Sequence, residues 1–432
     1  MDRIISSILD TDAYTFTVQY YVLKKFPSAK VKYSFFDRNN IVYPKGFGEK
    51  LKDQVNKISK SIRAHDCDIS FLKSSFPFIE EWYFNFLKGY KFNSDEVKIE
   101  QDEEGHLKID IEGYWWSTIM WEQPLLATIS EMYHKLKDDY VIYYSRKMEV
   151  KRAYHKAMAL LMNGVKFADM GTRRRMCYDV HEAVIEGFVK AQQDYDKYCE
   201  THHEHPYGKG KFLGTSNVEL ACGYNLPVLG TISHQLIQGQ EAVSNVAFCN
   251  GLAMQNWKEV FGDNLNMYLY DCFGDDIFFL YLSKENAHHF NLRIDSGDNY
   301  EQRDKIIEAY KKNGVDPLTK TVCFSNALDI PTAIEIHKDT YGKIDDIYGI
   351  GTEFTCGFKN VNYFGQEVPE VKELPIKPLN IVIKLTSFQK DNLSEQKAAV
   401  KLSCDKGKTV GDKKRVEEIQ RLIKEHIDFH SN

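Results

Sequence analysis

The stretch 291-NLRIDSGDNYEQRDKIIEAYKKNGVDPLTKTVCFSN-326 predicts two short apolar strands, over 292–294 and 321–324, with a polar turn and a helical stretch between them. A strand, a helix and a second strand in this order form the unit from which parallel sheets are built. Each strand is followed directly by polar residues, Asp295 after the first and Ser325 after the second. The unit therefore predicts polar side chains at the carboxyl edge of a parallel sheet.

The same alternation of short apolar strands and helical stretches begins near residue 144 and predicts further strands at 165–168, around Leu213, and at 228–230, 267–270 and 347–348. The number of strands is close to what a closed barrel needs, so we predict an α/β barrel domain over 141–365. Loops that follow barrel strands meet at one mouth, where ligands bind. We therefore expect one site to contain the polar residues after these strands: Asp169, Thr172, Arg173, Thr215, Ser216, Asn217, His234, Asp271, Arg293, Asp295, Ser325, Asn326 and the segment 349–352.

The segments on either side of the barrel predict an α+β domain and a C-terminal extension. Residues 29–36 and 96–112 alternate like half-buried antiparallel strands, and residues 47–93 between them are mostly helical in pattern. We expect an N-terminal α+β domain over 1–140, with a contribution from the C-terminal segment. The extension over 366–432 should contain a connector at 366–379, a strand marked by Ile381, Ile383 and Leu385, and an amphipathic helix marked by Val416, Ile419, Leu422, Ile423 and Ile427.

Composition excludes several classes of protein. Hydrophobic residues make up 43% and charged residues 27% of the 432 residues, which are ordinary values for a globular protein and exclude a fibrous or disordered chain. The net charge of -6 argues against a protein whose main partner is nucleic acid. No apolar run is long enough for a membrane helix, and nine cysteines without a C-x-x-C pair are typical of reduced thiols in the cytosol. We therefore expect a cytoplasmic protein that binds neither nucleic acid nor membranes.

Three groups of residues could carry chemistry, and each also has an ordinary structural explanation. The segment GIGT at 349–352 could hold a phosphate with its backbone N–H groups, or could be a plain turn between strand and helix. Arg293 and Asp295 share one face of a strand and could hold a sugar diphosphate with its metal, or could simply neutralise each other. His234 could act as a base, a ligand or a nucleophile, although most single histidines do none of these.

Six segments together resemble a known family. In chain order they read LDTDAY at 9–14, GTRR at 171–174, GTSN at 214–217, GTISH at 230–234, RIDSGD at 293–298 and GIGT at 349–352. The sequence is similar to nicotinate phosphoribosyltransferases over about residues 8–411, and the strings KLS at 401–403 and GK at 407–408 fit as well. The resemblance implies a type II phosphoribosyltransferase fold, in which an N-terminal α+β domain packs on an irregular α/β barrel. It also implies a head-to-tail homodimer whose subunits share active sites.

The activity that the resemblance implies is transfer of a phosphoribosyl group from phosphoribosyl pyrophosphate to nicotinate. The products are nicotinate mononucleotide and pyrophosphate, in NAD salvage. ATP is the implied co-substrate and Mg²⁺ the implied cofactor, and ATP hydrolysis is coupled through a phosphohistidine at His234. Asp295 matches an acid near the ribose and Mg²⁺. Either Asp271 or Glu219 could orient the imidazole, and the sequence leaves that choice open.

The resemblance also implies contacts for individual residues. Tyr14 matches an aromatic residue that reaches the pyridine ring from the neighbouring subunit. Ser216 stands where related nicotinamide enzymes carry an acid, and a hydroxyl can donate a hydrogen bond to the carboxylate of nicotinate. Catalytic roles are expected for His234, Asp295 and Arg293, and substrate contacts for Tyr14, Arg173, Thr215, Ser216 and Asp271. Phosphate contacts are expected for Arg38, Ser325, Gly349, Gly351, Thr352 and Lys408.

Three alternatives stand beside this prediction. Nicotinamide could be the acceptor, but Ser216 argues against it. Quinolinate could be the acceptor, but the chain length and the segment around His234 argue against it. The chain could also be an inactive relative that binds ligands as a scaffold, and the presence of His234, Arg293 and Asp295 argues against that.

Overall fold

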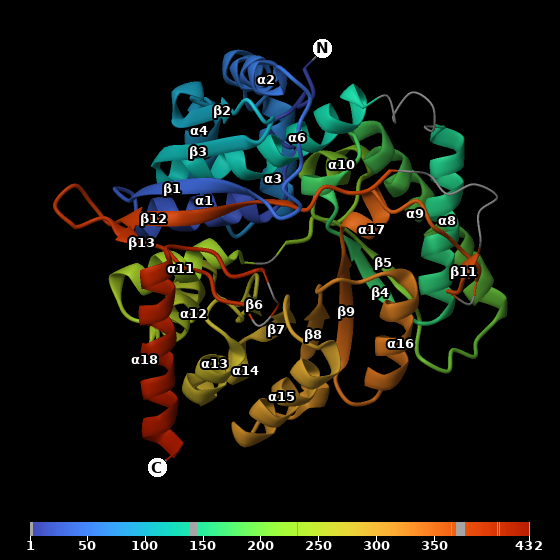
Figure 1. The fold of residues 1–432 in the computed structure, drawn as a ribbon. Coiled ribbons are helices and arrows are strands. Elements are labelled where there is room, and N and C mark those ends of the chain that lie inside the picture. Colours follow the sequence, from blue (N-terminus) through green and yellow to red (C-terminus); the bar gives the residue numbers. More distant parts are fainter. Residues whose placement is uncertain are drawn as a thin grey trace.

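The structure is a computed structural model of the chain (Figure 1). It describes residues 3–137, 145–230, 232–363, 365–368, 376–403, 405 and 407–431. Parts of the sequence-based prediction lie outside these residues: the domain boundary at 140–141, residues 369–375 of the connector, Cys404, and Thr231 in the GTISH segment. The division of the chain into domains therefore stays a prediction.

A parallel sheet of six strands forms the framework of the second half of the chain. Its order is β5-β4-β9-β8-β7-β6, and every neighbouring pair is parallel. An isolated parallel bridge between Thr215 and Val228 extends the sheet beyond β5. The strands are β4 (Lys166–Asp169), β5 (Lys211–Thr215), β6 (Met267–Leu269), β7 (Asn291–Ile294), β8 (Thr321–Phe324) and β9 (Asp345–Ile350).

The mixed α/β class and the predicted strands are confirmed, with one difference in detail. The segment 228–230, which was predicted as a strand, contributes only the isolated bridge at Val228. Within the described residues the ladder has two ends, the Val228 bridge and β6, so its hydrogen bonds are not joined into a ring.

Helices follow the parallel strands, and polar residues cap several of them at the strand ends. Asp298 accepts hydrogen bonds from the N–H groups of Tyr300 and Glu301, and Asp329 accepts one from Thr332. The capped helices pack around the outside of the parallel strands (Figure 1). The helices of this half are α8 (Arg146–Met162), α9 (Tyr178–Thr201), α10 (Val218–Tyr224), α11 (His234–Val243), α12 (Cys249–Phe261), α13 (Asp275–Tyr281), α14 (Lys284–His289), α15 (Asn299–Lys312), α16 (Ile330–Thr340) and α17 (Thr352–Thr355).

A second, antiparallel sheet lies beside the parallel one and combines both ends of the chain (Figure 1). Its order is β13-β12-β1-β3-β2. Lys30 of β1 pairs with Tyr114 of β3 on one side and with Gln389 of β12 on the other. The predicted C-terminal strand therefore completes the N-terminal sheet. The strands are β1 (Lys30–Asp37), β2 (Val97–Gln101), β3 (Leu107–Tyr114), β12 (Ile381–Gln389) and β13 (Lys397–Ala398).

Helices cover the antiparallel sheet and end the chain. The predicted helical region 47–93 forms three helices, and the predicted C-terminal helix buries Ile419 completely. No described helix is long and apolar enough to cross a membrane, and the eight described cysteines are free thiols. The helices are α1 (Tyr14–Lys25), α2 (Phe47–Ser61), α3 (Asp66–Ser75), α4 (Glu81–Gly89), α5 (Trp115–Thr118), α6 (Glu122–Leu136) and α18 (Lys413–Ser431).

A buried ion pair joins the N-terminal segment to the parallel sheet. Asp10 and Arg175 are fully buried, and two hydrogen bonds of 2.6 Å connect their side chains. Asn217 donates a further hydrogen bond of 2.9 Å to Asp10, and its backbone bridges to Asp12. A buried charge without a partner is very costly, so this pair fixes the position of the segment that precedes α1.

Candidate active site

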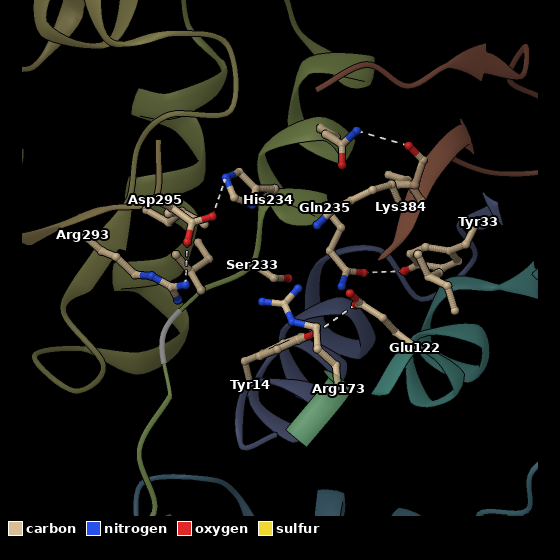
Figure 2. Close-up of a pocket in the computed structure, with 15 residues that line it drawn as sticks. Tyr14, Tyr33, Glu122, Arg173, Ser233, His234, Gln235, Arg293, Asp295 and Lys384 are labelled. Carbon is tan, nitrogen blue, oxygen red and sulfur yellow. Dashed lines mark hydrogen bonds and ion pairs between the residues drawn. The ribbon is translucent and has the colours of Figure 1, made fainter. Parts of the chain in front are cut away.

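A pocket opens between the carboxyl ends of the parallel strands and the antiparallel sheet (Figure 2). It brings together five residues that the sequence predicts for the site, from four separate segments: Tyr14, Arg173, His234, and Arg293 with Asp295. The predicted meeting of strand-end residues is thus realised for these positions. The remaining lining residues are Tyr33, Glu122, Ile232, Ser233, Gln235, Gln238, Leu269, Ile383, Lys384 and Leu385.

His234 begins α11 at the edge of this pocket, and its partner is Asp271. The imidazole Nε2 lies 2.9 Å from Oδ1 of Asp271, which lies two residues after the end of β6. The other carboxylate oxygen of Asp271 accepts a hydrogen bond of 2.7 Å from Ser296 and lies 3.7 Å from the Lys401 ammonium. Glu219 instead lies 3.4 Å from Ser6. The question that the sequence left open is therefore decided in favour of Asp271.

The surroundings of His234 favour a neutral imidazole. Burial lowers its pKa to about 4, and the nearby charge of Lys401 acts in the same direction. Burial alone would raise the pKa of the Asp271 carboxyl, but Lys401 and His234 hold it well below its ordinary value. An ionised carboxylate can only accept hydrogen bonds, so Nε2 of His234 carries the proton. The lone pair of the neutral ring is then on Nδ1, which can act as a nucleophile.

Arg293 and Asp295 form an ion pair on one face of β7 and its extension, as their spacing predicts. Arg293 Nη2 lies 3.0 Å from Asp295 Oδ1, and Arg293 Nε donates a hydrogen bond of 2.8 Å to the hydroxyl of Ser325. Burial would raise the pKa of Asp295, but Arg293 is the first of the charges that hold it below its ordinary value. The pair is satisfied and still lines the pocket, so a structural role and a binding role are compatible.

Tyr14 lines the pocket of its own chain, and the expectation that it reaches the site of a neighbouring subunit stays a prediction. Its hydroxyl donates a hydrogen bond of 3.0 Å to Glu122 and accepts one of 2.5 Å from Gln123. Burial raises its pKa well above the ordinary value, so the phenol is neutral. The physical reason for the placement is that the preceding residues are anchored by Asp10, so α1 begins beside Arg173.

Ser216 and Thr215 are buried in polar networks and are not among the described residues that line the pocket. The Ser216 hydroxyl donates a hydrogen bond of 2.7 Å to Asp12. The Thr215 hydroxyl donates one of 2.6 Å to Asp169, which also contacts His181 at 2.7 Å. Both hydroxyls therefore donate to carboxylates of their own chain, and their contacts with a substrate stay a prediction.

The glycines at 349 and 351 allow a close approach of Met170. A Cβ atom on Gly349 would lie 2.5 Å from the Met170 sulfur, and one on Gly351 would lie 2.7 Å from its carbonyl oxygen. Thr352 begins α17, and the buried ammonium of Lys156 donates to the carbonyl of Gly357 just after that helix, at 2.6 Å. Packing thus accounts for the two glycines, and a phosphate-binding role of this loop stays a prediction.

The predicted cations Arg38 and Lys408 lie at the rim of the site. Lys408 donates hydrogen bonds to Asn326 at 3.0 Å and to Asp405 at 2.5 Å. Asp405 in turn accepts one of 3.1 Å from the N–H of Gly297. Burial lowers the pKa of Arg38, and the like charge of Arg173 lowers it further. The C-terminal loop therefore packs over the turn that follows β7.

Comparison with known proteins identifies the family. Residues 165–425 match the nicotinate phosphoribosyltransferase (NAPRTase) family, and residues 9–130 match the N-terminal domain of that family. The chain belongs to the nicotinate phosphoribosyltransferase family. The two matches cover most of the parallel sheet and of the antiparallel sheet.

Similar proteins support this membership in the family over nearly the full length. The chain is 34% identical to a nicotinate phosphoribosyltransferase of Desulforapulum autotrophicum, over 97% of this chain and 98% of the other. It is also 34% identical to a probable nicotinate phosphoribosyltransferase of Schizosaccharomyces pombe, over 95% and 96%. The crystal structure of nicotinate phosphoribosyltransferase from Porphyromonas gingivalis superposes with a TM-score of 0.86 at 30% identity, covering 97% of this chain and 100% of that one.

Sequence reasoning missed several charged or polar residues of this nicotinate phosphoribosyltransferase pocket. Glu122 contacts Tyr14, and Gln235 accepts a hydrogen bond of 2.9 Å from the Trp115 indole. Lys384 comes from β12 in the C-terminal segment. A lysine inside a predicted apolar strand was the signal that could have revealed Lys384. Glu122 and Gln235 carry no comparable signal, because ordinary helices contain both residue types.

A divalent cation would find ligand atoms beside the same pocket. One ligand atom each of His234, Asp271 and Asp295 lie within 4.8 Å of one another. Carboxylate oxygens are the ligands that Mg²⁺ prefers, so Asp271 and Asp295 fit the predicted ion better than the imidazole does. Of the two acids, Asp295 has the more exposed side chain, 24% against 5%, which makes it the more accessible ligand.

Proposed function

We propose that this chain is a nicotinate phosphoribosyltransferase that joins nicotinate to phosphoribosyl pyrophosphate in NAD salvage. The products are nicotinate mononucleotide and pyrophosphate. The observation that carries the proposal is the pocket that unites Arg173, the Arg293–Asp295 pair and the His234–Asp271 pair in a chain of this family.

The geometry supports a transfer in which the pocket stabilises charge. As pyrophosphate leaves, positive charge develops on the ribose, and we propose that Asp295, whose lowered pKa keeps it ionised, stabilises this charge. The electron pair of the broken C–O bond leaves with pyrophosphate, whose negative charge Arg293 and Arg38 can balance at the rim. The nitrogen of the pyridine ring already has a lone pair and forms the new C–N bond, so the pocket requires no strong base.

We propose that ATP acts through His234. Its Nδ1 lone pair would attack the terminal phosphorus of ATP, an N–P bond would form, and the bond to the bridging oxygen would break with ADP as leaving group. The charge on the phosphorylated imidazole would then bias the nearby loops toward tight substrate binding before hydrolysis returns the histidine. Asp271 holds the reactive tautomer by accepting a hydrogen bond from the N–H at Nε2.

Mg²⁺ is proposed as the metal of the reaction, held by Asp295 with Asp271 close behind it. When bound, it would supply positive charge to the diphosphate that leaves.

We also propose a homodimer, although the pocket residues named above belong to one chain. The free thiols of the described residues support a reducing compartment such as the cytosol.

The proposal is tested by incubating the purified protein with radiolabelled nicotinate, phosphoribosyl pyrophosphate and Mg²⁺, with and without ATP. We expect labelled nicotinate mononucleotide, formed faster when ATP is present. Parallel reactions with nicotinamide and with quinolinate should give far less product. Absence of product from nicotinate with a folded protein would contradict the proposal. If only nicotinamide or only quinolinate gave a product, that compound would replace nicotinate as the proposed substrate.

A further inference from the structure

Lys384 is a cation of the pocket for which no described residue supplies an ion-pair partner. It lies in the middle of β12, between Ile383 and Leu385, and all three residues line the pocket. Figure 2 shows its side chain extending from the strand into the pocket, toward His234 and Gln235. A lysine placed against apolar neighbours is normally paired, because an unpaired ammonium loses much of its hydration there.

The charges that line the pocket leave one positive charge in excess. Arg293 is paired with Asp295 at 3.0 Å, and Glu122 lies near Arg173 (Figure 2). His234 and Tyr14 are neutral. Lys384 shares the charge of Glu122 with Arg173, and no described residue forms an ion pair with it. A pocket with this balance is suited to a ligand that carries one additional negative charge.

The hydroxyl of Ser216, which the sequence analysis assigned to the choice of substrate, already forms a hydrogen bond within the chain. The Ser216 hydroxyl donates a hydrogen bond to Asp12. A substrate carboxylate beside Ser216 would therefore meet the negative charge of Asp12. Gln235 offers a better donor. Its Oε1 accepts from Tyr33 and from the donor-only indole of Trp115, which orients the amide so that its NH₂ group faces away from both.

We infer that Lys384, assisted by the NH₂ group of Gln235, binds the carboxylate of nicotinate and so distinguishes the acid from its neutral amide. The inference rests on the proposed function, because it names the contact that selects the substrate of that same pocket. An ammonium and an amide N–H can both donate to one carboxylate, and the ammonium gains its missing counter-charge. The carboxamide of nicotinamide would supply no charge and would leave Lys384 unpaired.

The state of the lysine gives the inference a second observable. Burial lowers the pKa of Lys384 to about 8, and Arg173 and Lys401 act in the same direction, while Glu122 and Asp295 oppose them. The other ionisable groups that line the pocket are Tyr14, Tyr33, His234 and Arg293. The ammonium is charged below this pKa and becomes neutral above it. Nicotinate should therefore bind more weakly as the pH rises through about 8.

The test compares Lys384→Met and Lys384→Arg with the parent, and uses Lys390→Met as the matched control because Lys390 is exposed just after the same strand. KM is measured separately for nicotinate, phosphoribosyl pyrophosphate and nicotinamide at about pH 7 and about pH 9. Melting temperatures establish that each variant is folded. Activity of the parent with nicotinate is the separate test of the proposed function.

We expect Lys384→Met to raise KM for nicotinate by about 10- to 100-fold at the lower pH, the range for loss of a hydrogen bond to a charged group. KM for phosphoribosyl pyrophosphate and for nicotinamide should change little. In the parent, KM for nicotinate should rise about tenfold between the two pH values, whereas Lys384→Arg should remove that dependence because a guanidinium keeps its proton. Lys390→Met should behave like the parent.

Two outcomes would overturn the inference while leaving the proposed function intact. An active parent whose Lys384→Met variant keeps the parent's KM for nicotinate would show that Lys384 does not contact the carboxylate. A rise in KM confined to phosphoribosyl pyrophosphate would assign the ammonium to a phosphate instead. A parent without nicotinate activity would refute the proposed function itself and the inference with it.

Discussion

His234 is the residue on which the proposed coupling to ATP depends. Replacing it by alanine removes the Nδ1 nucleophile, so ATP should no longer stimulate the reaction, while a slow ATP-independent reaction should persist. The variant is compared with His430→Ala, which changes an exposed histidine of α18. The measurements are the initial rate with and without ATP and the label transferred from γ-labelled ATP to histidine. Labelled histidine in His234→Ala would refute the assignment.

The hydrogen bond between Ser216 and Asp12 determines which substitution of Ser216 gives an interpretable activity. Ser216→Asp would place a carboxylate beside Asp12, and two such charges about 4 Å apart repel by roughly 4 kcal/mol at an effective dielectric of about 20. Lost activity in that variant would therefore report misfolding as readily as lost selectivity. Ser216→Ala is the cleaner change because it introduces no charge.

We expect Ser216→Ala to keep kcat/KM for nicotinate within about threefold of the parent, because the lost hydrogen bond contributes to stability, by about 1 kcal/mol, and not to substrate binding. The melting temperature should fall by no more than roughly 2–4 °C in a chain of this size. A loss of about a hundredfold in kcat/KM for nicotinate at an unchanged melting temperature would return Ser216 to the substrate site.

At the scale of elements, the N-terminal segment depends on the buried pair of Asp10 and Arg175. Asp10→Asn removes one charge and leaves the Arg175 guanidinium buried without its partner, which should cost about 3–5 kcal/mol of the free energy of unfolding. Denaturant unfolding measures the loss. The exposed pair Arg421–Glu425 of α18 provides the control, since Glu425→Gln should cost less than about 1 kcal/mol. Equal costs for the two variants would contradict the argument.

The same pair predicts a dependence on pH. Burial alone would raise the pKa of Asp10, but the charge and hydrogen bonds of Arg175 more than offset this, so the pKa is lowered in the folded protein. A carboxyl whose pKa is lowered by folding contributes stability above its unfolded pKa of about 3.9 and loses that contribution as the pH falls further. The difference in stability between the parent and Asp10→Asn should therefore shrink in acid.

Elements made from local patterns could be predicted from the sequence, whereas contacts between distant segments could not. The strand–helix–strand unit at 291–326 appears as β7, α15 and β8 because alternation and capping are properties of neighbouring residues. The contact of Ser216 with Asp12 and the approach of Lys384 to the pocket depend on how separate segments pack. The resemblance to a family supplied His234, Arg293 and Asp295, but it did not supply the two hydroxyl networks or the position of Tyr14.

At the scale of the whole molecule, the placement of Tyr14 makes a prediction about mixed assemblies. Tyr14 and His234 line the same pocket of one chain. In an assembly of Tyr14→Ala chains with His234→Ala chains, every pocket would then lack one of the two residues. We expect no recovery of ATP-stimulated activity when the two purified variants are unfolded, mixed and refolded. Each variant refolded alone, and the refolded parent, are the controls.

Recovery of a substantial part of the parent's activity in verified mixed dimers would contradict the single-chain pocket. It would mean that Tyr14 acts across a subunit boundary, as the resemblance to the family implied. The two arrangements are distinguishable because shared sites would regain both residues at one of the two sites of every mixed dimer, whereas single-chain sites would regain them at none.

The pairing of β1 with β12 also sets the order in which a ribosome can complete this protein. Lys30 leaves the ribosome well before its partner Gln389, which is made 359 residues later (389 − 30). At roughly 5–20 residues per second, β1 waits on the order of tens of seconds with one edge unpaired, which exposes it to wrong pairing. Lys384 arrives on the same late strand. A nascent chain therefore cannot assemble the pocket until β12 has left the ribosome, and a chaperone that shields β1 during that interval should raise the yield of active enzyme.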